Sequence, residues 1–449
     1  MLTSHEAGTS GIRWRIVALL VLASFVAYLL RSNLSVAGER MIVDLGLSKV
    51  QLGAVLAAFA WGYAIFQFPG GIWGDRIGSR RAIAILAVGW GVVNLAVGFT
   101  PSTSVASPVV VIASLMTLRF LMGVLQAPLV VFGGTIASWF PVTGWAVPNG
   151  WVNVGLTFGA AATGPLITWL VSTVGWRGSF MATAPLGLVL AGIWWWYVRD
   201  TPAEHAGVRQ AELELITGDR PAERPRSAPG AWKRVLRNRQ VRLLSLGYFC
   251  SNYLFYFFVN WLYIYLIESR KFTMLEGGWY ASAPWITGAI GAGVGAYLCD
   301  GLSTRIGKRR GMRTIGATGL TLAAGLMLLA ANAQSAYLCV LFLSLCLACQ
   351  QLTEGAYWAA TISVAEADAA TACGVLNTGG NVVGGIGALM VPLMVESLGW
   401  PAALAAASVF ALVGAGLWFL IDADAPEIRV ATVVERRVHS NSGPRNLQP

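Results

Sequence analysis

The feature that most constrains this chain is a series of long apolar segments separated by short charged ones. A helix needs roughly 20 mainly apolar residues to cross the hydrocarbon core of a bilayer. About twelve such segments can be read from the sequence, so we predict an all-α membrane protein. They lie near 14–38, 51–73, 82–100, 109–139, 149–172, 177–198, 241–266, 278–299, 313–332, 336–364, 373–395 and 401–421.

Composition supports this prediction and excludes several other classes of protein. Only 12% of the residues are charged, about half the share usual in soluble domains. So few charges cannot cover the surfaces of the two or three soluble domains that 449 residues would otherwise allow. The 52 glycines and 19 tryptophans suit close helix packing and anchoring at the lipid headgroups. A disulfide-stapled secreted protein, a nucleic-acid binder and a disordered chain are all excluded.

The basic residues are distributed unevenly between the two sides of the membrane. With the N-terminus placed inside, 24 of the 31 Lys and Arg residues lie on the inner side and five on the outer side. Arg31 and Arg119 fall within apolar segments. Because inner loops carry an excess of Lys and Arg, both termini are predicted to be cytoplasmic. The net charge of +10 then reflects orientation and attraction to anionic lipid, not nucleic acid.

The segments divide into two groups of six around a polar, basic stretch. We therefore expect a six-helix bundle over 1–198 and a second over 241–422. Between them, 199–240 is predicted to be a cytoplasmic linker with one short surface helix. Residues 423–449 are predicted to form a cytoplasmic tail.

A short internal repeat links the two groups. The pattern R-I-G-x-R-R occurs at 76–81 and recurs 229 positions later, at 305–310. Two six-helix halves in parallel orientation explain this spacing, and transporters are built from such repeats. An acid paired with nearby arginines could hold the transporter closed on one side of the membrane. The alternative is a basic loop that serves only to orient the chain in the membrane, and it would explain the arginines but not the repeated pattern. The candidate gating residues are Asp75, Arg76, Gly78, Arg80, Arg81, Asp300, Arg305 and Arg309.

Several longer segments carry a resemblance to a known family. They are R-S-N-L-S-V-A at 31–37, FAWGYAIFQFPGGIWGDRIG at 59–78, RFLMGVLQAP at 119–128, RDTPAEH at 199–205, FCSNYLFYFFVNWLYIYL at 249–266 and GVLNTGGNVVGG at 374–385. The chain resembles a major facilitator superfamily transporter, and within it the anion:cation symporter family. The resemblance implies the major facilitator fold, a monomer in a bacterial inner membrane, and a small organic anion such as a sugar acid as substrate.

Arg31 is the main candidate for binding that anion. It follows an apolar run from Ile16 to Leu30, and a charge inside a membrane helix requires a partner or a function. A guanidinium can hold a carboxylate through two parallel hydrogen bonds. The resembled family carries its anion-binding arginine in this R-x-N motif. A structural arginine paired to another helix is the alternative. Arg119 matches a superfamily R-x-x-x-G motif, which the resembled proteins use structurally or in proton relay, and we expect it to be structural.

Polar and aromatic side chains on other segments are expected to complete the site. Unpaired amides are costly in hydrocarbon, so such residues bridge helices or face a wet cavity. Asn252 and Asn377 could be either helix-bridging residues or substrate contacts. The predicted substrate-binding set, besides Arg31, is Tyr28, Tyr63, Gln67, Gln126, Tyr256 and Asn381.

Two positions depart from the resembled family in a way that concerns coupling. Many members have an aspartate before the first-helix arginine and a glutamate in R-F-L-x-G-x-x-E-A-P, and these acids are associated with proton coupling. Here the positions hold Leu30 and Gln126, which do not titrate. Glu354, in an apolar segment, is the remaining candidate for coupling to a proton. Two alternatives are that it neutralises a basic group or that it lies near a helix end. We expect cation coupling, by proton or sodium, with an uncoupled facilitator or exchanger as alternatives.

Other functions were weighed against organic-anion transport. A drug or cation exporter would explain GAAATGP at 159–165, but no acid lies near the centre of the first seven segments to attract a cation. A membrane-embedded enzyme is disfavoured because the three histidines fall in loops or tails, and no cofactor or metal motif is visible. A non-transporting receptor would retain the same binding site.

Two further predictions concern structure. Small-residue patterns such as Gly155-x-x-x-Gly159 are expected to mark close helix packing. Trp194, Trp195 and Trp196 are expected to be interface anchors.

Overall fold

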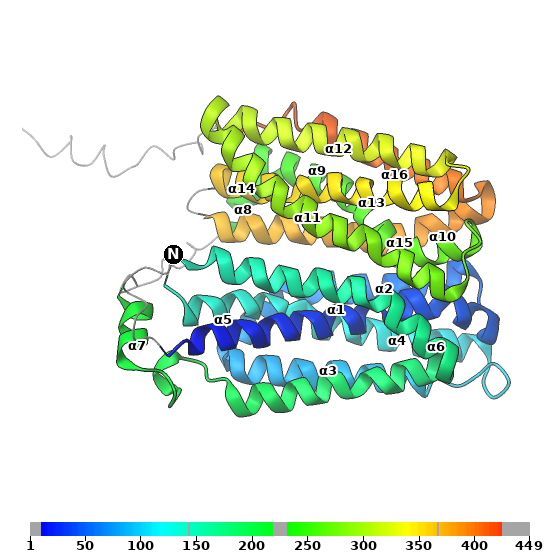
Figure 1. The fold of residues 1–449 in the computed structure, drawn as a ribbon, viewed down its shortest axis with the longest axis horizontal. Coiled ribbons are helices and arrows are strands. Elements are labelled where there is room, and N and C mark those ends of the chain that lie inside the picture. The colour runs from blue at the N-terminus through cyan, green and yellow to red at the C-terminus, as the bar shows by residue number, and fades with distance from the viewer. Residues whose placement is uncertain (1–9, 142–143, 219–230, 366–367, 424–449) are drawn as a thin grey trace, which may run out of the picture.

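The chain folds into a bundle of long helices that run roughly along one axis (Figure 1). The computed structural model describes residues 10–141, 144–218, 231–365 and 368–423. Within these ranges nine helices are long and apolar enough to span a membrane, or ten when one bent pair is included. All twelve predicted segments fall on helices. One long helix contains two of them, and the helix Met274–Ile306, which holds the segment near 278–299, is not counted among the nine. The predicted all-α membrane fold is confirmed.

Helices α1 to α6 form the N-terminal half. Their bounds are α1 Ile12–Leu45, α2 Lys49–Ile77, α3 Ser79–Gly98, α4 Pro108–Gln126, the 3-10 helix η2 Ala127–Val130, α5 Val131–Trp139 and α6 Ala146–Tyr197. The fourth predicted segment is broken at η2, which contains a proline. Helix α6 holds the fifth and sixth segments, joined at Gly175 in the left-handed region, with φ 73°. A glycine suits this reversal because it adopts positive φ without steric cost.

Helices α9 to α16 form the C-terminal half. Their bounds are α9 Arg239–Asn260, α10 Leu262–Glu268, α11 Met274–Ile306, α12 Lys308–Asn332, α13 Ala336–Leu352, α14 Glu354–Ala365, α15 Ala369–Leu398 and α16 Trp400–Leu417. Helices α9 and α10 make one span bent by 56°. Helix α16 ends at Leu417, earlier than the 421 expected from hydropathy.

The linker contains more structure than the sequence indicated. One short surface helix was predicted, but the 3-10 helix η4 (Pro202–Glu204) and two α-helices, α7 (Gln210–Thr217) and α8 (Ala231–Arg237), are present. The carboxylate of Glu212 accepts hydrogen bonds from the backbone N–H groups of Ile12 and Arg13 at the start of α1. These donors have no intrahelical partner, so α7 caps the first membrane helix from outside it. The tail beyond 423 lies outside the described residues.

Two ends of the bundle can be defined from these connections. The linker end carries Ser10, Gly78, Gly307 and the linker helices, and the far end carries the connections at Gly46, Gly175 and Gly399. In Figure 1 the linker end is on the left and the far end on the right.

The internal repeat is present in the backbone itself. Gly78 and Gly307, within the two R-I-G-x-R-R segments, have φ/ψ values of 84°/154° and 89°/150°. At the far end, Gly175 and Gly399 have values of 73°/171° and 80°/172°. Matching positions in the two halves thus make the same left-handed turn, which confirms the parallel repeat predicted from the loop motif.

Helix caps follow the same repeat. Ser48 with Gln51 forms a capping box at the start of α2, and Thr273 with Glu276 forms one at the start of α11. Serine side chains cap α4 and α13 in the same way. Each cap satisfies backbone donors that would otherwise be left without a partner at the helix end.

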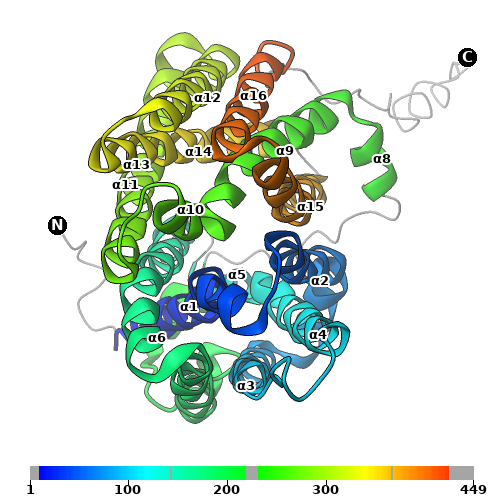
Figure 2. The same cartoon turned by 90° about the vertical axis from the view of Figure 1, so that its right-hand side faces the viewer.

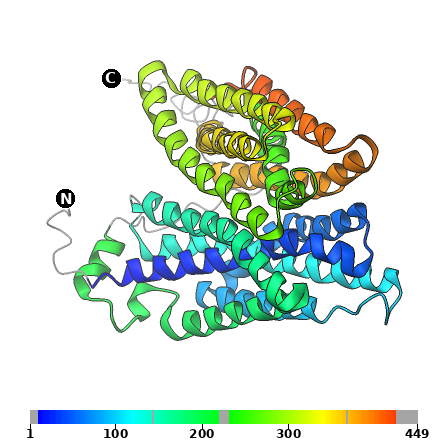
Figure 3. The ribbon, with the colours of Figure 1, turned by 45° about the vertical axis from the view of Figure 1, so that its right-hand side comes forward.

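The two halves meet toward the far end and diverge toward the linker end (Figure 3). Seen from the far end, α2 lies beside α15 and α6 lies beside α11 (Figure 2). The ammonium of Lys49 lies 2.8 Å from a carboxylate oxygen of Glu268 across this boundary. The Ser282 hydroxyl donates to the carbonyl of Ala161 at 2.5 Å. The far end is therefore held closed by polar contacts and close packing.

Glycines allow the closest helix approaches. A Cβ added at Gly164 would overlap the carbonyl oxygen of Gly278 in the other half. Within the N-terminal half, Gly155 and Gly159 lie against the backbone of α1 at Val21 and Phe25. The close packing predicted for Gly155-x-x-x-Gly159 is confirmed, and GAAATGP at 159–165 contributes to the contact between the halves.

The prediction for the three consecutive tryptophans was partly wrong. Trp196 is 76% exposed and Trp195 is 48% exposed, as interface anchors would be, but Trp194 is fully buried in the core. Consecutive residues on a helix point in directions about a third of a turn apart. A run of three therefore cannot lie wholly on the lipid-facing side.

Candidate functional site

Arg31 lies in the interior of the molecule, where helices from both halves meet. It follows about five turns of unbroken helix in α1, and its side chain is 4% exposed. Neighbouring Leu29 and Leu30 are fully buried and apolar. A charge in such surroundings must be compensated by nearby groups or by a ligand.

Four aromatic rings surround the Arg31 guanidinium. Its Cζ lies 5.2 Å from the ring centroid of Tyr28, 4.6 Å from Phe59, 5.3 Å from Tyr63 and 5.8 Å from Tyr256. Ring faces attract a cation most strongly where water is excluded. We refer to these four rings as the aromatic box. The sequence analysis singled out three of them but not Phe59, although its spacing one turn before Tyr63 on α2 could have indicated it.

A chain of hydrogen bonds leads from Arg31 into the C-terminal half. The guanidinium donates to the hydroxyl of Tyr256 on α9 at 3.0 Å. That hydroxyl donates to Oδ1 of Asn381 on α15 at 2.7 Å. The Asn381 amide donates in turn to the carbonyl and side-chain oxygens of Asn377, at 2.8 and 3.1 Å. The structure thus brings together Arg31, Tyr28, Tyr63, Tyr256 and Asn381 of the predicted set.

A second buried arginine lies beside the first. The Arg119 side chain, 3% exposed, donates to the backbone carbonyl of Arg31 at 3.0 Å, and its Cζ lies 5.0 Å from the Phe59 ring. In the described part of the chain no carboxylate lies within 4.0 Å of either guanidinium. Arg119 therefore positions the backbone at Arg31, and the pair creates a positive centre without a described carboxylate in contact.

The two predicted glutamine contacts have unsatisfied polar atoms. Gln126 is fully buried, and its amide donates to the carbonyl of Ala27 at 2.8 Å. Its oxygen, together with both amide atoms of Gln67, is buried without a hydrogen-bond partner. Buried polar atoms nearly always have partners. These three atoms therefore lie in the interior without a partner among the described residues, and neither glutamine lines the clefts described below.

Glu354 lies apart from Arg31, in the C-terminal half. It is the first residue of α14, after the break that ends α13 at Leu352. Its Oε1 accepts hydrogen bonds from the hydroxyl of Tyr248 at 2.6 Å and from the indole of Trp358 at 2.8 Å. Of the alternatives considered for this residue, the structure places it at a helix end and does not pair it with Arg31.

Asn252 and Asn377 make hydrogen bonds within their own helices. Asn252 donates to the carbonyl of Tyr248 one turn earlier on α9, at 2.9 Å. Asn377 accepts from Asn381 on α15, as described above. Neither bond bridges two helices. Asn260, in the last turn of α9, is also buried.

A small cleft of about 50 Å³ adjoins the aromatic box between the two halves. It shares Tyr28 with the box, and its other walls come from α6, α9, α11 and α13. Its lining residues are Tyr28, Asn153, Leu156, Thr157, Phe255, Trp285, Gly288, Leu347 and Gln351. A second cleft, of about 30 Å³, lies closer to the far end and shares Trp285 with the first. Aromatic and amide side chains therefore continue from Arg31 along the boundary between the halves.

Two of the predicted gating residues, Arg80 and Arg309, form polar side-chain contacts, and neither contact joins the two halves. The Arg80 guanidinium donates twice to the carbonyl of Trp195, at 3.1 and 2.8 Å, and stacks on its ring. The Asp200 carboxylate accepts from the backbone N–H of Arg80 at 2.8 Å and lies against Gly78. Arg76 and Arg81 are exposed, and the side chain of Asp75 lies outside the described part of the chain.

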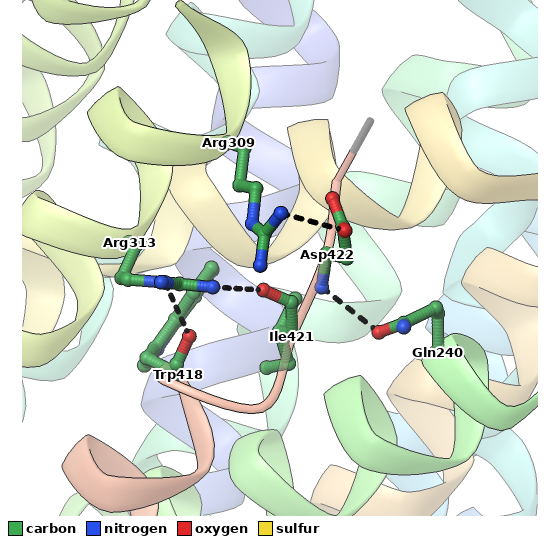
Figure 4. Close-up of polar contacts among 6 residues, drawn as sticks. All are labelled: Gln240, Arg309, Arg313, Trp418, Ile421 and Asp422. Atoms are coloured by element: carbon green, nitrogen blue, oxygen red, sulfur yellow. Dashed lines mark hydrogen bonds and ion pairs between the residues drawn. The ribbon is translucent and has the colours of Figure 1, made fainter. Parts of the chain in front are cut away.

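The matching segment of the C-terminal half is attached to the end of α16 (Figure 4). Arg309 forms an ion pair with Asp422 at 3.0 Å. Arg313 donates to the carbonyls of Trp418 and Ile421, just beyond the end of α16. Asp300 and Arg305 are exposed. Each segment is thus bonded within its own half at the end where the halves diverge.

The arrangement of two repeated helical halves around a buried basic centre defines a multi-pass membrane transporter. Residues 20–366 match the Major Facilitator Superfamily, and the chain belongs to this superfamily. Its members are transporters and not enzymes. In the described part of the chain no three His, Cys, Asp or Glu side chains gather as metal ligands would.

Two relatives and one solved structure place the chain more closely. A protein named "Probable galactarate/D-glucarate transporter GudP", from Escherichia coli K12, is 34% identical over 320 residues, which cover 68% of this chain and 70% of the relative. The "D-galactonate transporter" of Escherichia coli O6:H1 is 28% identical over 433 residues, 93% of this chain and 97% of the relative. An inward-facing, unoccupied bacterial homologue of the human lysosomal transporter Spinster shares the fold. Its TM-score is 0.75 at 16% identity, over 91% of this chain and 97% of that one.

Proposed function

We propose that this protein is a secondary transporter of a small organic anion, and that Arg31 binds the carboxylate. One observation carries the proposal: a buried arginine lies between the two halves, in an aromatic box, without a described carboxylate partner. An anionic substrate would supply the missing charge through a bidentate hydrogen bond. The names of the relatives point to sugar acids, and the unsatisfied amide atoms of Gln67 and Gln126 suit hydroxyl groups.

The transport cycle follows from the same contacts. The far end is closed by Lys49, Glu268 and the glycine contact between α6 and α11. We propose that the halves rock around Arg31, so that the far end opens as the two R-I-G-x-R-R segments approach each other. The positions of the basic residues favour a cytoplasmic linker end in a bacterial inner membrane. We propose a monomer with the units 1–198, 199–240, 241–422 and 423–449.

Glu354 is the proposed proton carrier. Ser107 caps the span that contains Gln126, and Ser335 caps the span that contains Glu354. Gln126 and Glu354 each lie 19 positions after their cap, at the break of their span. We propose that Glu354, at the equivalent position of the other half, takes the place of the acid that the resembled family has at position 126.

A binding measurement tests the substrate class. Purified protein is heated with galactarate, glucarate, galactonate, benzoate or a quaternary ammonium ion, and the shift in unfolding temperature is recorded. A ligand of the folded state stabilises it by mass action. Sugar acids should stabilise wild type but neither Arg31→Ala nor Arg31→Lys, since lysine cannot form the bidentate bond. Equal stabilisation of wild type and variants, or stabilisation by the cation, would contradict the proposal and favour an exporter.

A flux measurement tests coupling. Uptake of the stabilising anion into proteoliposomes is driven by a pH gradient or a sodium gradient, with wild type and Glu354→Gln compared. Proton coupling through Glu354 requires acceleration by the pH gradient in wild type only. Acceleration by sodium alone would identify a sodium symporter. Exchange without a response to either gradient would identify an uncoupled carrier.

A further inference from the structure

The linker helix α8 carries a surface that the transport cycle does not use. It comprises Ala231–Arg237 and leads directly into the membrane helix α9 at Arg239. In Figure 2 it lies at the edge of the C-terminal half, beyond α9 and α15. Its position at the start of a membrane span places it at the depth of the lipid headgroups.

The inner side of α8 is fixed to the protein. Arg234 and Asp368 form a bidentate ion pair, with both nitrogen–oxygen distances at 2.8 Å. Asp368 is 3% exposed and stands immediately before α15. Val235 is also buried, at 3% exposure. The ion pair and Val235 therefore restrict rotation of the helix, although the Arg234 side chain is itself 42% exposed. Trp232, Lys233, Leu236 and Arg237 are exposed.

The outward side has two adjacent stripes of different chemistry. Trp232 and Leu236, one turn apart, are 56% and 45% exposed. Lys233 and Arg237, also one turn apart, are exposed beside them, and the Lys233 ammonium lies 5.4 Å from the Trp232 ring centroid. Exposure of a tryptophan and a leucine side by side to water would be unfavourable. An apolar stripe beside a basic stripe is the pattern of a helix that lies in a membrane interface.

We propose that the outward face of α8 binds the headgroups of anionic phospholipids. Trp232 and Leu236 would enter the boundary between headgroups and acyl chains, and Lys233 and Arg237 would contact lipid phosphates. The ion pair between Arg234 and Asp368 connects this anchor to α15. Since α15 also carries Asn381 of the hydrogen-bond chain to Arg31, the lipid contact is attached to a helix of the candidate site. This inference does not depend on the nature of the transported substrate.

Lipid binding to the full-length protein tests the proposal. Detergent-purified protein is titrated with phosphatidylglycerol or phosphatidylcholine, and bound lipid is counted by native mass spectrometry. Wild type should retain phosphatidylglycerol preferentially. Lys233→Gln/Arg237→Gln should weaken that retention roughly 30-fold, from two basic residues near an anionic surface. The matched control is Arg15→Gln/Arg209→Gln, which removes the same charge from exposed positions at the same end and should retain the lipid as wild type does.

Two further variants separate the anchor from general charge attraction. Asp368→Asn keeps every basic residue of α8 but loosens the helix, and it should also lose the preference for phosphatidylglycerol. With brominated phosphatidylglycerol, wild type should show a quenched component of tryptophan emission that Trp232→Phe lacks. Three outcomes would overturn the proposal. The first is unchanged retention of phosphatidylglycerol in Lys233→Gln/Arg237→Gln, and the second is an equal loss of retention in the Arg15→Gln/Arg209→Gln control. The third is equal retention of phosphatidylglycerol and phosphatidylcholine by wild type.

Discussion

The guanidinium of Arg31 donates a hydrogen bond of 3.0 Å to the hydroxyl of Tyr256, and this bond joins a helix of the N-terminal half to one of the C-terminal half. The two residues are 225 positions apart in the chain. The same hydroxyl donates to Asn381 on a third helix. Any rotation of one half relative to the other must stretch or replace this connection. The residue proposed to bind the anion is therefore also one that responds to movement between the halves.

Removal of the Tyr256 hydroxyl should weaken anion binding. Tyr256→Phe retains the ring of the aromatic box but leaves Arg31 and Asn381 with one hydrogen bond fewer. Because such a bond contributes ~1 kcal/mol, we expect about 5-fold to 10-fold lower affinity in calorimetric titration. Tyr253→Phe is the matched control, since this hydroxyl on the same helix has no hydrogen-bond partner among the described residues and its ring stacks on Phe410. An equal effect of both changes would show that Tyr256 acts only through packing.

An acid at position 126 should introduce a dependence on pH. The side chain of Gln126 donates to the carbonyl of Ala27. In Gln126→Glu only the protonated carboxyl can donate to this carbonyl, so this conformation favours the protonated form. Uptake into proteoliposomes should therefore respond to an imposed pH gradient more strongly than in wild type. A response identical to that of wild type, in a variant that still binds the anion, would contradict this prediction.

The ion pair between Lys49 and Glu268 should favour closure of the far end. Both side chains are about a quarter exposed, so the pair contributes only ~0.2–1 kcal/mol. Glu268→Gln should raise the alkylation rate of a cysteine introduced at Ser35, which lines the cleft near the far end, by about 2-fold to 5-fold. The native cysteines are replaced beforehand. Asp44→Asn breaks the Arg40–Asp44 pair within α1 instead and should leave the rate unchanged.

The glycine contact between α6 and α11 should be essential for the same closure. A methyl group at Gly164 would meet the backbone of Gly278, which cannot move as a flexible side chain could. Gly164→Ala should lower the transport rate at least 10-fold, because closure would require the halves to separate. Gly192→Ala is the control on the same helix, where an added Cβ meets nothing within 4 Å. Wild-type transport in Gly164→Ala would show that the contact is dispensable.

His205 should make stability depend on pH. Burial, with the nearby charge of Arg199 as a smaller cause, lowers the pKa of His205 below its ordinary value of 6.5. As pH falls through 6.5 the unfolded state takes up the proton first, so the free energy of unfolding decreases until the folded-state pKa is reached. The drop in unfolding temperature between neutral and mildly acidic buffer should be smaller in His205→Gln. The other two histidines, His5 and His439, lie outside the described residues.

Much of the fold could be predicted from local patterns. Apolar segments of membrane-spanning length located the helices, and the repeated R-I-G-x-R-R segments predicted two parallel halves. The sequence-based predictions were wrong where contacts between helices determined the structure. Trp194 is buried in the core, and α16 ends at Leu417, before a segment that Arg313 binds at the carbonyls of Trp418 and Ile421. Hydropathy counts residues along the chain and contains no information on such partners.

The sequence by itself determined that the chain spans a membrane and that Arg31 lies within a helix. These properties follow from the transfer of each side chain into hydrocarbon, which depends on its identity and immediate neighbours. Only the tertiary structure decided that Phe59 completes the aromatic box, that Tyr256 and not Glu354 contacts Arg31, and that the far end is closed. Those contacts join residues far apart in the chain, and they depend on how helices of two halves pack against each other.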